Sequence, residues 1–134
     1  LFRSSMIYQR QQQITTYYGN VVLHHGDSLL TGSVLKVFFS PNNQSFYDLI
    51  TTGHPATYTT LSAKKQQPLT AHADKIEFIP KLHQTILTGH AQVIQKNQQI
   101  SAPKIIYNTA NGNLYSYNNS QSKAMTTVTI ESWH

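Results

Sequence analysis

The sequence lacks cysteine, has few charged residues and contains no long apolar run. Without cysteine there is no disulfide framework and no thiolate metal site. No apolar run approaches the roughly 18–20 residues that a membrane-spanning helix needs. Charged residues make up 11% of the 134 residues, well below the quarter or so that is usual for a globular domain. The helix formers Ala, Leu and Glu are also few, so a helical bundle is not expected.

Polar uncharged residues are abundant where most globular domains have charged ones. Gln, Asn, Thr, Ser and Tyr are abundant, and Thr and Tyr suit strands that have one polar face. The length predicts a single domain over residues 1–134. Because the chain begins at Leu1 rather than Met, we expect a processed or trimmed product, so that any signal peptide or membrane anchor lies outside this sequence.

The formal net charge is +5, which raises the question of a nucleic-acid partner. A nucleic-acid groove needs clustered cations. Here the Lys and Arg residues are spread singly, and Lys64-Lys65 is the only adjacent pair. The sequence therefore predicts that the protein does not bind nucleic acid.

A short pattern of Lys, an aliphatic residue, any residue and an aromatic residue occurs three times. Its copies begin at Lys36, Lys75 and Lys104. A second signal, Gly followed by β-type residues, alternates with it and begins at Gly19, Gly53 and Gly89, and short turn-like segments separate the two signals. Two signals at strand-length spacing predict a hairpin that is repeated about three times along the chain.

Within each copy, apolar residues alternate with polar ones. Ile76 and Phe78 share one face of a strand, while Lys75 and Glu77 share the other. No window shows a sustained helical stripe. The alternation predicts an all-β fold in which the hairpins bury one continuous face. Further strands are expected at the two ends of the chain, at Met6-Ile7-Tyr8, Leu114–Tyr117 and Met125–Ile130.

Six segments occur in the order and rough spacing of a known family over nearly the whole chain, and together they are fairly specific. They are Tyr17-Tyr18-Gly19-Asn20-Val21-Val22, Gly53-x-Pro55-Ala56-Thr57-Tyr58, Ala71-His72-Ala73, Leu87-Thr88-Gly89-x-Ala91, Lys104-Ile105-x-Tyr107 and Thr126-Thr127-Val128. Through them the chain resembles the LptA (OstA) family of periplasmic lipopolysaccharide-transport proteins. One departure is Ala102-Pro103-Lys104, where the family has Gly-Asp-Lys. Because Pro removes a backbone donor, we expect a strand to begin at Pro103.

The resemblance implies a twisted, incompletely closed β-jellyroll built of repeated antiparallel hairpins. It also implies a periplasmic protein that needs no cofactor, shields the acyl chains of lipid A in an apolar trough and joins copies of itself head to tail. The implied partners are lipopolysaccharide, LptC at the inner membrane and LptD at the outer membrane. Since LptC and LptD carry similar domains, the soluble domain of LptC stays open as an alternative identity.

The residues expected to line the lipid A trough share the inward parity of the predicted strands. A plain sandwich core would use the same alternation, so the sequence does not separate a trough from a core. The expected trough residues are Tyr17, Val21, Leu23, Val37, Phe39, Tyr58, Ile76, Phe78, Leu87, Val93, Ile105 and Tyr107.

Other chemistries find little support in the sequence. The seven histidines fall at positions that accept any polar residue across the repeats, so we expect solvent-facing side chains and no metal site. The acidic residues offer no facing pair for glycoside hydrolysis, and no nucleophile or phosphate motif is present, so no catalytic residue is predicted. The recurring lysines are expected on a solvated outer face, and contact of their ammonium groups with lipid phosphates stays open as an alternative. A sugar-binding β-sandwich, with aromatic residues exposed on one face, is the alternative from a different class.

Overall fold

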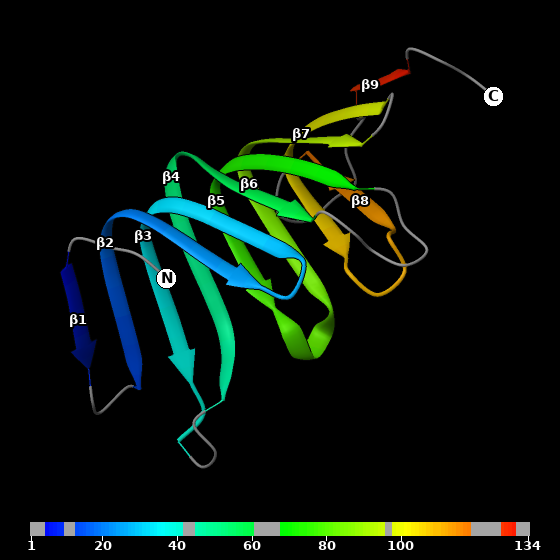
Figure 1. The fold of residues 1–134 in the computed structure, drawn as a ribbon. Coiled ribbons are helices and arrows are strands. Elements are labelled where there is room, and N and C mark those ends of the chain that lie inside the picture. The colour runs from blue at the N-terminus through cyan, green and yellow to red at the C-terminus, as the bar shows by residue number, and fades with distance from the viewer. Residues whose placement is uncertain are drawn as a thin grey trace.

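The computed structural model describes residues 5–9, 13–41, 45–60, 68–95, 98–118 and 127–130. Nine strands form a single antiparallel sheet in the order β1-β2-β3-β4-β5-β6-β7-β8, and β9 pairs separately with β7 (Figure 1). The strands are β1 (Ser5–Gln9), β2 (Ile14–His25), β3 (Ser28–Phe39), β4 (Phe46–Thr60), β5 (Leu69–Ile79), β6 (Gln84–Gln95), β7 (Gln98–Asn108), β8 (Leu114–Tyr117) and β9 (Thr127–Ile130). A 3₁₀ turn, η1 (Pro80–Leu82), joins β5 to β6.

The repeat predicted from the sequence is confirmed as a series of hairpins. The Gly signals lie in β2, β4 and β6, and the Lys-aliphatic-x-aromatic signals lie in β3, β5 and β7. The expected terminal strands are present as β1, β8 and β9, although Met125 and Thr126 lie outside the described residues. Since no pairing joins β1 to β8 in the part of the chain that the structure describes, the sheet is open. The expected all-β, incompletely closed jellyroll is thus confirmed.

Register shifts interrupt all five pairings between the long strands near their middles. They fall between Tyr18 and Val21, Thr31 and Val34, Thr52 and Ala56, His72 and Lys75, and Thr88 and Ala91. We call this row of irregularities the bulge line. Bulges bend strands, and Figure 1 shows the long strands bending there. Gly89 has a φ of +84° in the β6 bulge, a backbone conformation that glycine adopts without strain.

The bulge line divides the sheet into two layers that face each other. Layer A contains residues 14–18, 34–39, 46–52, 75–79, 84–88 and 104–107, and layer B contains residues 21–25, 28–32, 56–60, 69–73, 91–95 and 98–101. Small residues pair beside the bulge line, with Ala56 opposite Ala73 and Ala91 opposite Ala102. Ala56, Ala73 and Ala91 are almost completely buried, so these small side chains let the two layers converge there.

The expectation that a strand begins at Pro103 is wrong. β7 begins at Gln98 and continues through Pro103. Pro103 lies in the register shift between β6 and β7, and on the other side of β7 it lies between the segments that pair with β9 and β8. A residue without an N–H group is tolerated at such a position because no ladder hydrogen bond is required of it.

Candidate functional site

The inner faces of the two layers form one continuous apolar cluster. All of the residues expected to line a trough belong to it or pack against it. Those that are buried are Val21, Val37, Tyr58, Ile76, Phe78, Leu87, Val93, Ile105 and Tyr107, and those that are partly buried are Tyr17, Leu23 and Phe39. The alternation along each strand therefore selected residues that the fold brings together, and their role toward a lipid stays a prediction.

The protein's own side chains fill the space between the layers in this conformation. Ile76, Leu87 and Ile105 have no exposed surface, and Tyr58 of layer B lies with its ring centroid 6.4 Å from that of Tyr107 in layer A. Burial, and after it the neighbouring Tyr58, raises the pKa of Tyr107 above its ordinary value. The accessible parts of the cluster are its margins, where the partly buried Tyr17, Leu23 and Phe39 lie.

The interior contains almost no polar chemistry. Among the described residues, the buried polar side chains are all threonines, and those with the inner parity are Thr15, Thr51, Thr60 and Thr85, whereas Thr16 pairs with the outward-facing Lys36. Neutral hydroxyls of this kind carry no charge that could pair with an ionised group, and they are not general acids or bases of ordinary strength. The interior is therefore suited to hydrocarbon rather than to a charged ligand.

The sequence analysis missed the contacts of one residue at the margin of the apolar cluster, His25. His25 is exposed, as expected, but its ring also lies 5.5 Å from that of Phe46 and 5.3 Å from that of Phe78. It shares the parity of Val21 and Leu23, and this signal could have placed it on the inner face. Layer B thus ends in an imidazole that contacts two aromatic rings of layer A.

The other described histidines do not assemble a metal centre. His54 and His90 lie exposed at the bulge line, and His90 Nδ1 lies within hydrogen-bond distance of Asp74 Oδ2, at 3.0 Å. Within the described ranges, no group of three or more His, Cys, Asp or Glu side chains could hold a metal ion. The structure therefore offers no support for metal-dependent chemistry at these histidines.

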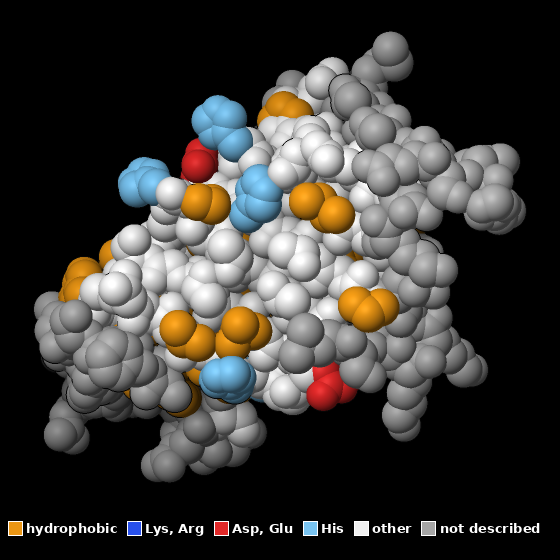
Figure 2. All heavy atoms as spheres, turned by 45° about the horizontal axis from the view of Figure 1, so that its top comes forward, with side chains coloured by type: hydrophobic (Ala, Val, Ile, Leu, Met, Phe, Trp, Pro, Cys, Tyr) orange, Lys and Arg blue, Asp and Glu red, His pale blue; other side chains and the backbone are white. Residues whose placement is uncertain are grey.

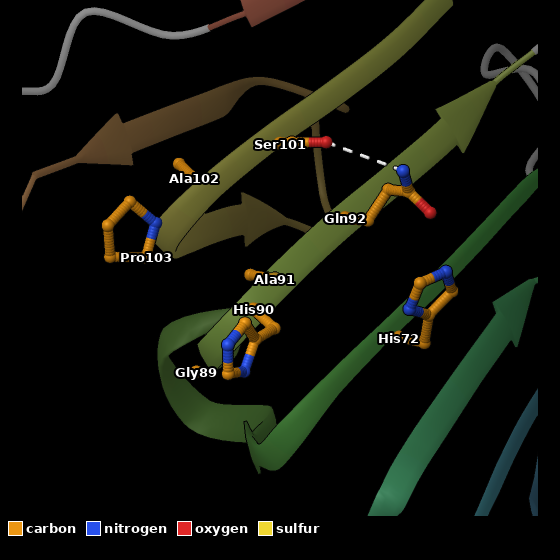
Figure 3. Close-up of a pocket in the computed structure, with 8 residues that line it drawn as sticks. All are labelled: His72, Gly89, His90, Ala91, Gln92, Ser101, Ala102 and Pro103. Carbon is orange, nitrogen blue, oxygen red and sulfur yellow. Dashed lines mark hydrogen bonds between the residues drawn. The ribbon is translucent and has the colours of Figure 1, made fainter.

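A hollow with a volume of about 650 Å³ lies on the outer surface at the bulge line of β6 and β7 (Figure 3). Figure 3 shows side chains from neighbouring strands around it, and Gln92 Nε2 donates to Ser101 Oγ at 3.4 Å. Its lining residues are His72, Gly89, His90, Ala91, Gln92, Ser101, Ala102 and Pro103, none of which is Phe, Tyr or Trp. Since sugar rings stack on such aromatic faces, this hollow does not favour the sugar-binding alternative.

Hydrophobic side chains on the outer surface do not gather into one patch on the face that Figure 2 shows. They appear singly or in pairs among polar atoms and histidines. Large exposed apolar residues occur on several strands, with Tyr18 on β2, Tyr47 on β4 and Tyr115 on β8. The continuous apolar surface of this fold is therefore the inner one.

Two carboxyl groups meet on the outer face of layer A, which the sequence analysis did not anticipate. Burial, a hydrogen bond that the protonated Asp48 donates to Glu77, and the like charge of Glu77 raise the pKa of Asp48 to about 7. Glu77 therefore favours the protonated form of Asp48.

The recurring lysines lie on the outer face of layer A, as expected. Lys36 and Lys75 are exposed, and Lys104 Nζ lies 5.8 Å from the centre of the Tyr117 ring. Lys36 pairs with Ile50 of β4, and Ile50 pairs with Glu77 of β5. Lys36 therefore lies in the same cross-strand row as Glu77, and Lys75 lies in the next row of outward-facing residues. These lysines flank the outer surface and do not enter the apolar cluster.

The sheet ends in two unlike edges that lie at opposite ends of the molecule (Figure 1). At one end β1 pairs with β2 on one side only, among the described residues. At the other end, residues 104–107 of β7 pair with β8 and residues 98–101 pair with β9. A single strand thus forms one edge, and two short strands form the other. No helix among the described residues is long and apolar enough to cross a membrane.

Comparison with known proteins places this geometry in a family. Residues 4–113 match the family model described as LptA/(LptD N-terminal domain) LPS transport protein. Lipopolysaccharide export system protein LptH of Pseudomonas aeruginosa is 27% identical over 100 residues. That match covers 74% of this chain but 56% of LptH, so the chain spans about half the length of this curated relative.

The fold is also that of a solved structure. The crystal structure of LptH, the LptA-homologous periplasmic component of the lipopolysaccharide transport device of Pseudomonas aeruginosa, superimposes with a TM-score of 0.84. The superposition covers 98% of this chain and 93% of that chain, at 22% sequence identity. The two chains therefore share one architecture over nearly their whole lengths.

Proposed function

The chain belongs to the LptA/(LptD N-terminal domain) family of LPS transport proteins, and from this premise we propose that it carries lipopolysaccharide across the periplasm. Residues 1–134 act as one domain that shelters the acyl chains of lipid A between its two layers and leaves the sugar headgroup in water. The protein is a carrier and a bridge rather than an enzyme. LptC at the inner membrane and LptD at the outer membrane are its proposed neighbours.

The observation that carries this proposal is the continuous apolar inner face of an open sheet. Its buried polar residues, among those described, are all threonines, so hydrocarbon meets no unpaired charge there. Each methylene that leaves water contributes about 0.8 kcal/mol, and several acyl chains together give a large driving force. The absence of charge also suits a lipid that has to move on, because no ion pair holds it in one place.

The two unlike edges of the sheet support the bridging part of the proposal. An isologous dimer pairs the same surface of both subunits, whereas pairing of one edge with the other generates a row that grows. Here β1 would pair with the β8 and β9 edge of the next copy. Strand addition of this kind draws its affinity from main-chain hydrogen bonds, so a similar domain on LptC or LptD could end the row.

A comparison of intact lipopolysaccharide with its delipidated polysaccharide tests the proposal directly. We expect intact lipopolysaccharide to bind and the polysaccharide to bind at least about a hundredfold more weakly, because that difference corresponds to burial of only a few methylenes. Equal binding of both would favour the sugar-binding alternative. Failure of the folded protein to bind either molecule would refute the proposed function.

A further inference from the structure

The position of His25 shows how the two layers meet away from the bulge line. Ser28 pairs with His25 on one side and with Thr60 on the other, so His25 lies near the last residue of β4. Its ring nevertheless lies 5.5 Å from that of Phe46, the first residue of β4. A straight strand of 15 residues would separate its ends by roughly 50 Å. The contact is possible only because β4 folds back on itself at the bulge line.

His25 therefore marks a margin that we call the mouth, where the free ends of the two layers come together. Among the described residues, ring contacts of His25 span the mouth. The rings of His25 and Phe46 meet edge to face with an interplanar angle of 82°, and the rings of His25 and Phe78 meet at 5.3 Å and 62°. Phe78 belongs to the buried cluster, so the imidazole lies directly over the interior.

The mouth is held more weakly than the opposite margin. At the bulge line the strands pass from one layer to the other, so covalent bonds join the layers there. At the mouth, the described residues supply ring contacts of His25 with Phe46 and Phe78 rather than backbone hydrogen bonds. Residues just behind the mouth are nearly inaccessible, with Leu49 and Leu69 each 2% exposed. A chain of hydrocarbon can reach them from this margin only if the mouth opens.

We propose that the mouth is the entrance for acyl chains and that His25 is the latch that closes it. This inference rests on the proposed function. The layers would separate at the mouth by pivoting about the bulge line, which breaks the contacts of His25 with Phe46 and Phe78 and leaves the strand pairing within each layer intact. The acyl chain then takes the place of side-chain contacts between the layers.

An imidazole suits this role because it tolerates both water and aromatic rings. His25 is exposed as a whole while its ring contacts two Phe rings. When the mouth opens, the ring nitrogen atoms of His25 can hydrogen-bond to water, so opening leaves no polar group of this ring unpaired. A large apolar residue at position 25 would instead favour the closed mouth, because opening would return its whole surface to water.

Crosslinking across the mouth tests the entrance. The chain has no cysteine of its own, so His25→Cys/Phe78→Cys introduces one defined pair, which a short bismaleimide can join. The matched control is Thr59→Cys/Thr70→Cys, a cross-strand pair on the outer face of layer B that does not span the mouth. We expect crosslinking to weaken binding of intact lipopolysaccharide at least about tenfold in the mouth pair and to leave the control pair unchanged.

The outcomes separate this inference from the proposed function. Equal binding before and after crosslinking of the mouth pair would overturn the entrance while leaving lipopolysaccharide binding established. Absence of binding in the folded, uncrosslinked protein would refute the proposed function, and the inference would fall with it. If His25→Cys/Phe78→Cys does not fold, His25→Cys/Phe46→Cys replaces it, because Phe46 is only partly buried.

Single substitutions at adjacent positions give a second test that needs no crosslinker. His24 and His25 are neighbours in β2, but His24 has the opposite parity and lies on the outer face. We expect His25→Ala to raise the association rate for intact lipopolysaccharide at least about threefold, since rates scale with the population of the open state. His24→Ala should leave the rate unchanged. Equal rates in wild type and both variants would contradict a latch at His25.

Discussion

Tyr58 and Tyr107 meet across the interior with ring centroids 6.4 Å apart, although two strands separate β4 from β7 in the sheet. The contact exists only because the bent sheet brings layer B over layer A. We predict that a double-mutant cycle with Tyr58→Leu and Tyr107→Leu gives a coupling of about 0.5–1.5 kcal/mol in the free energy of unfolding. Chemical denaturation of the four proteins measures it. A cycle between Tyr58 and the exposed Tyr115 should be additive, and equal couplings in both cycles would argue against a specific contact.

Phe38 and Phe39 are neighbours in sequence with different surroundings. Phe39 packs against the apolar cluster, whereas the ring of Phe38 lies 6.1 Å from that of the exposed Tyr47. A carboxylate at position 39 would face hydrocarbon without a partner. We therefore predict that Phe39→Glu weakens binding of intact lipopolysaccharide at least about tenfold, while Phe38→Glu leaves it nearly unchanged. Titration of each folded variant with lipopolysaccharide gives the answer, and equal losses would exclude Phe39 from the lipid path.

Gly32 lies beside the bulge line at a position where a side chain has no room. A Cβ atom there would overlap the Thr51 hydroxyl and would lie 2.7 Å from the carbonyl oxygen of Thr52. The Thr51 side chain can turn away, but the Thr52 backbone is held in the sheet. We predict that Gly32→Ala lowers the free energy of unfolding by about 1–3 kcal/mol. In Gly26→Ala, nothing lies within 4 Å of the new Cβ, and only the positive φ opposes it, so urea denaturation should show a smaller loss of about 1 kcal/mol.

Asp48 is expected to make stability depend on pH. Burial and Glu77 raise its pKa from 3.8 to about 7 in the folded protein. The folded state therefore binds this proton more tightly than the unfolded state, so the stabilisation is complete below about pH 4 and is lost as the pH rises through about 7. Asp48→Asn keeps a donor toward Glu77 at every pH. We predict that it raises the free energy of unfolding at pH 8 by roughly 1 kcal/mol, a value reduced because water screens the partly exposed carboxyl.

Glu77→Gln provides the companion measurement for Asp48. Removing the like charge should allow Asp48 to ionise at lower pH. The loss of stability should therefore also occur at lower pH. Thermal or urea denaturation between pH 4 and pH 8 follows both variants. A stability difference between wild type and Asp48→Asn that stays constant over this range would contradict the raised pKa of Asp48.

The β1 edge is expected to control assembly. Successive N–H groups of a strand point to opposite sides, so only one of Met6 and Ile7 can direct its N–H away from β2. We predict that Pro, placed at whichever of Met6 and Ile7 directs its N–H away from β2, leaves the domain folded. It should weaken self-association at least about tenfold, because it removes a donor from the free edge. Light scattering over a wide concentration range measures association. A wild-type chain that stays monomeric throughout, or a dimer that never grows, would contradict head-to-tail assembly.

The sequence by itself determined the repeat and the face of each strand. Side chains alternate with a period of two along any strand, so the alternation of Ile76, Glu77 and Phe78 was enough to assign inner and outer positions. The two signals of the repeat identified the hairpins because glycine is needed where the chain bulges and branched or aromatic residues are favoured where it pairs. The terminal strands were found for the same local reason.

Only the tertiary structure decided which residues meet across the interior. The contact of His25 with Phe46 and Phe78 depends on how far the strands bend at the bulge line, and no local pattern carries that angle. The pairing of Asp48 with Glu77, and the place of Pro103 inside β7 rather than at its start, depend on the register between strands. A strand's periodicity records which way a side chain points, whereas its contacts depend on the curvature and register of the whole sheet, which are properties of many pairings acting together.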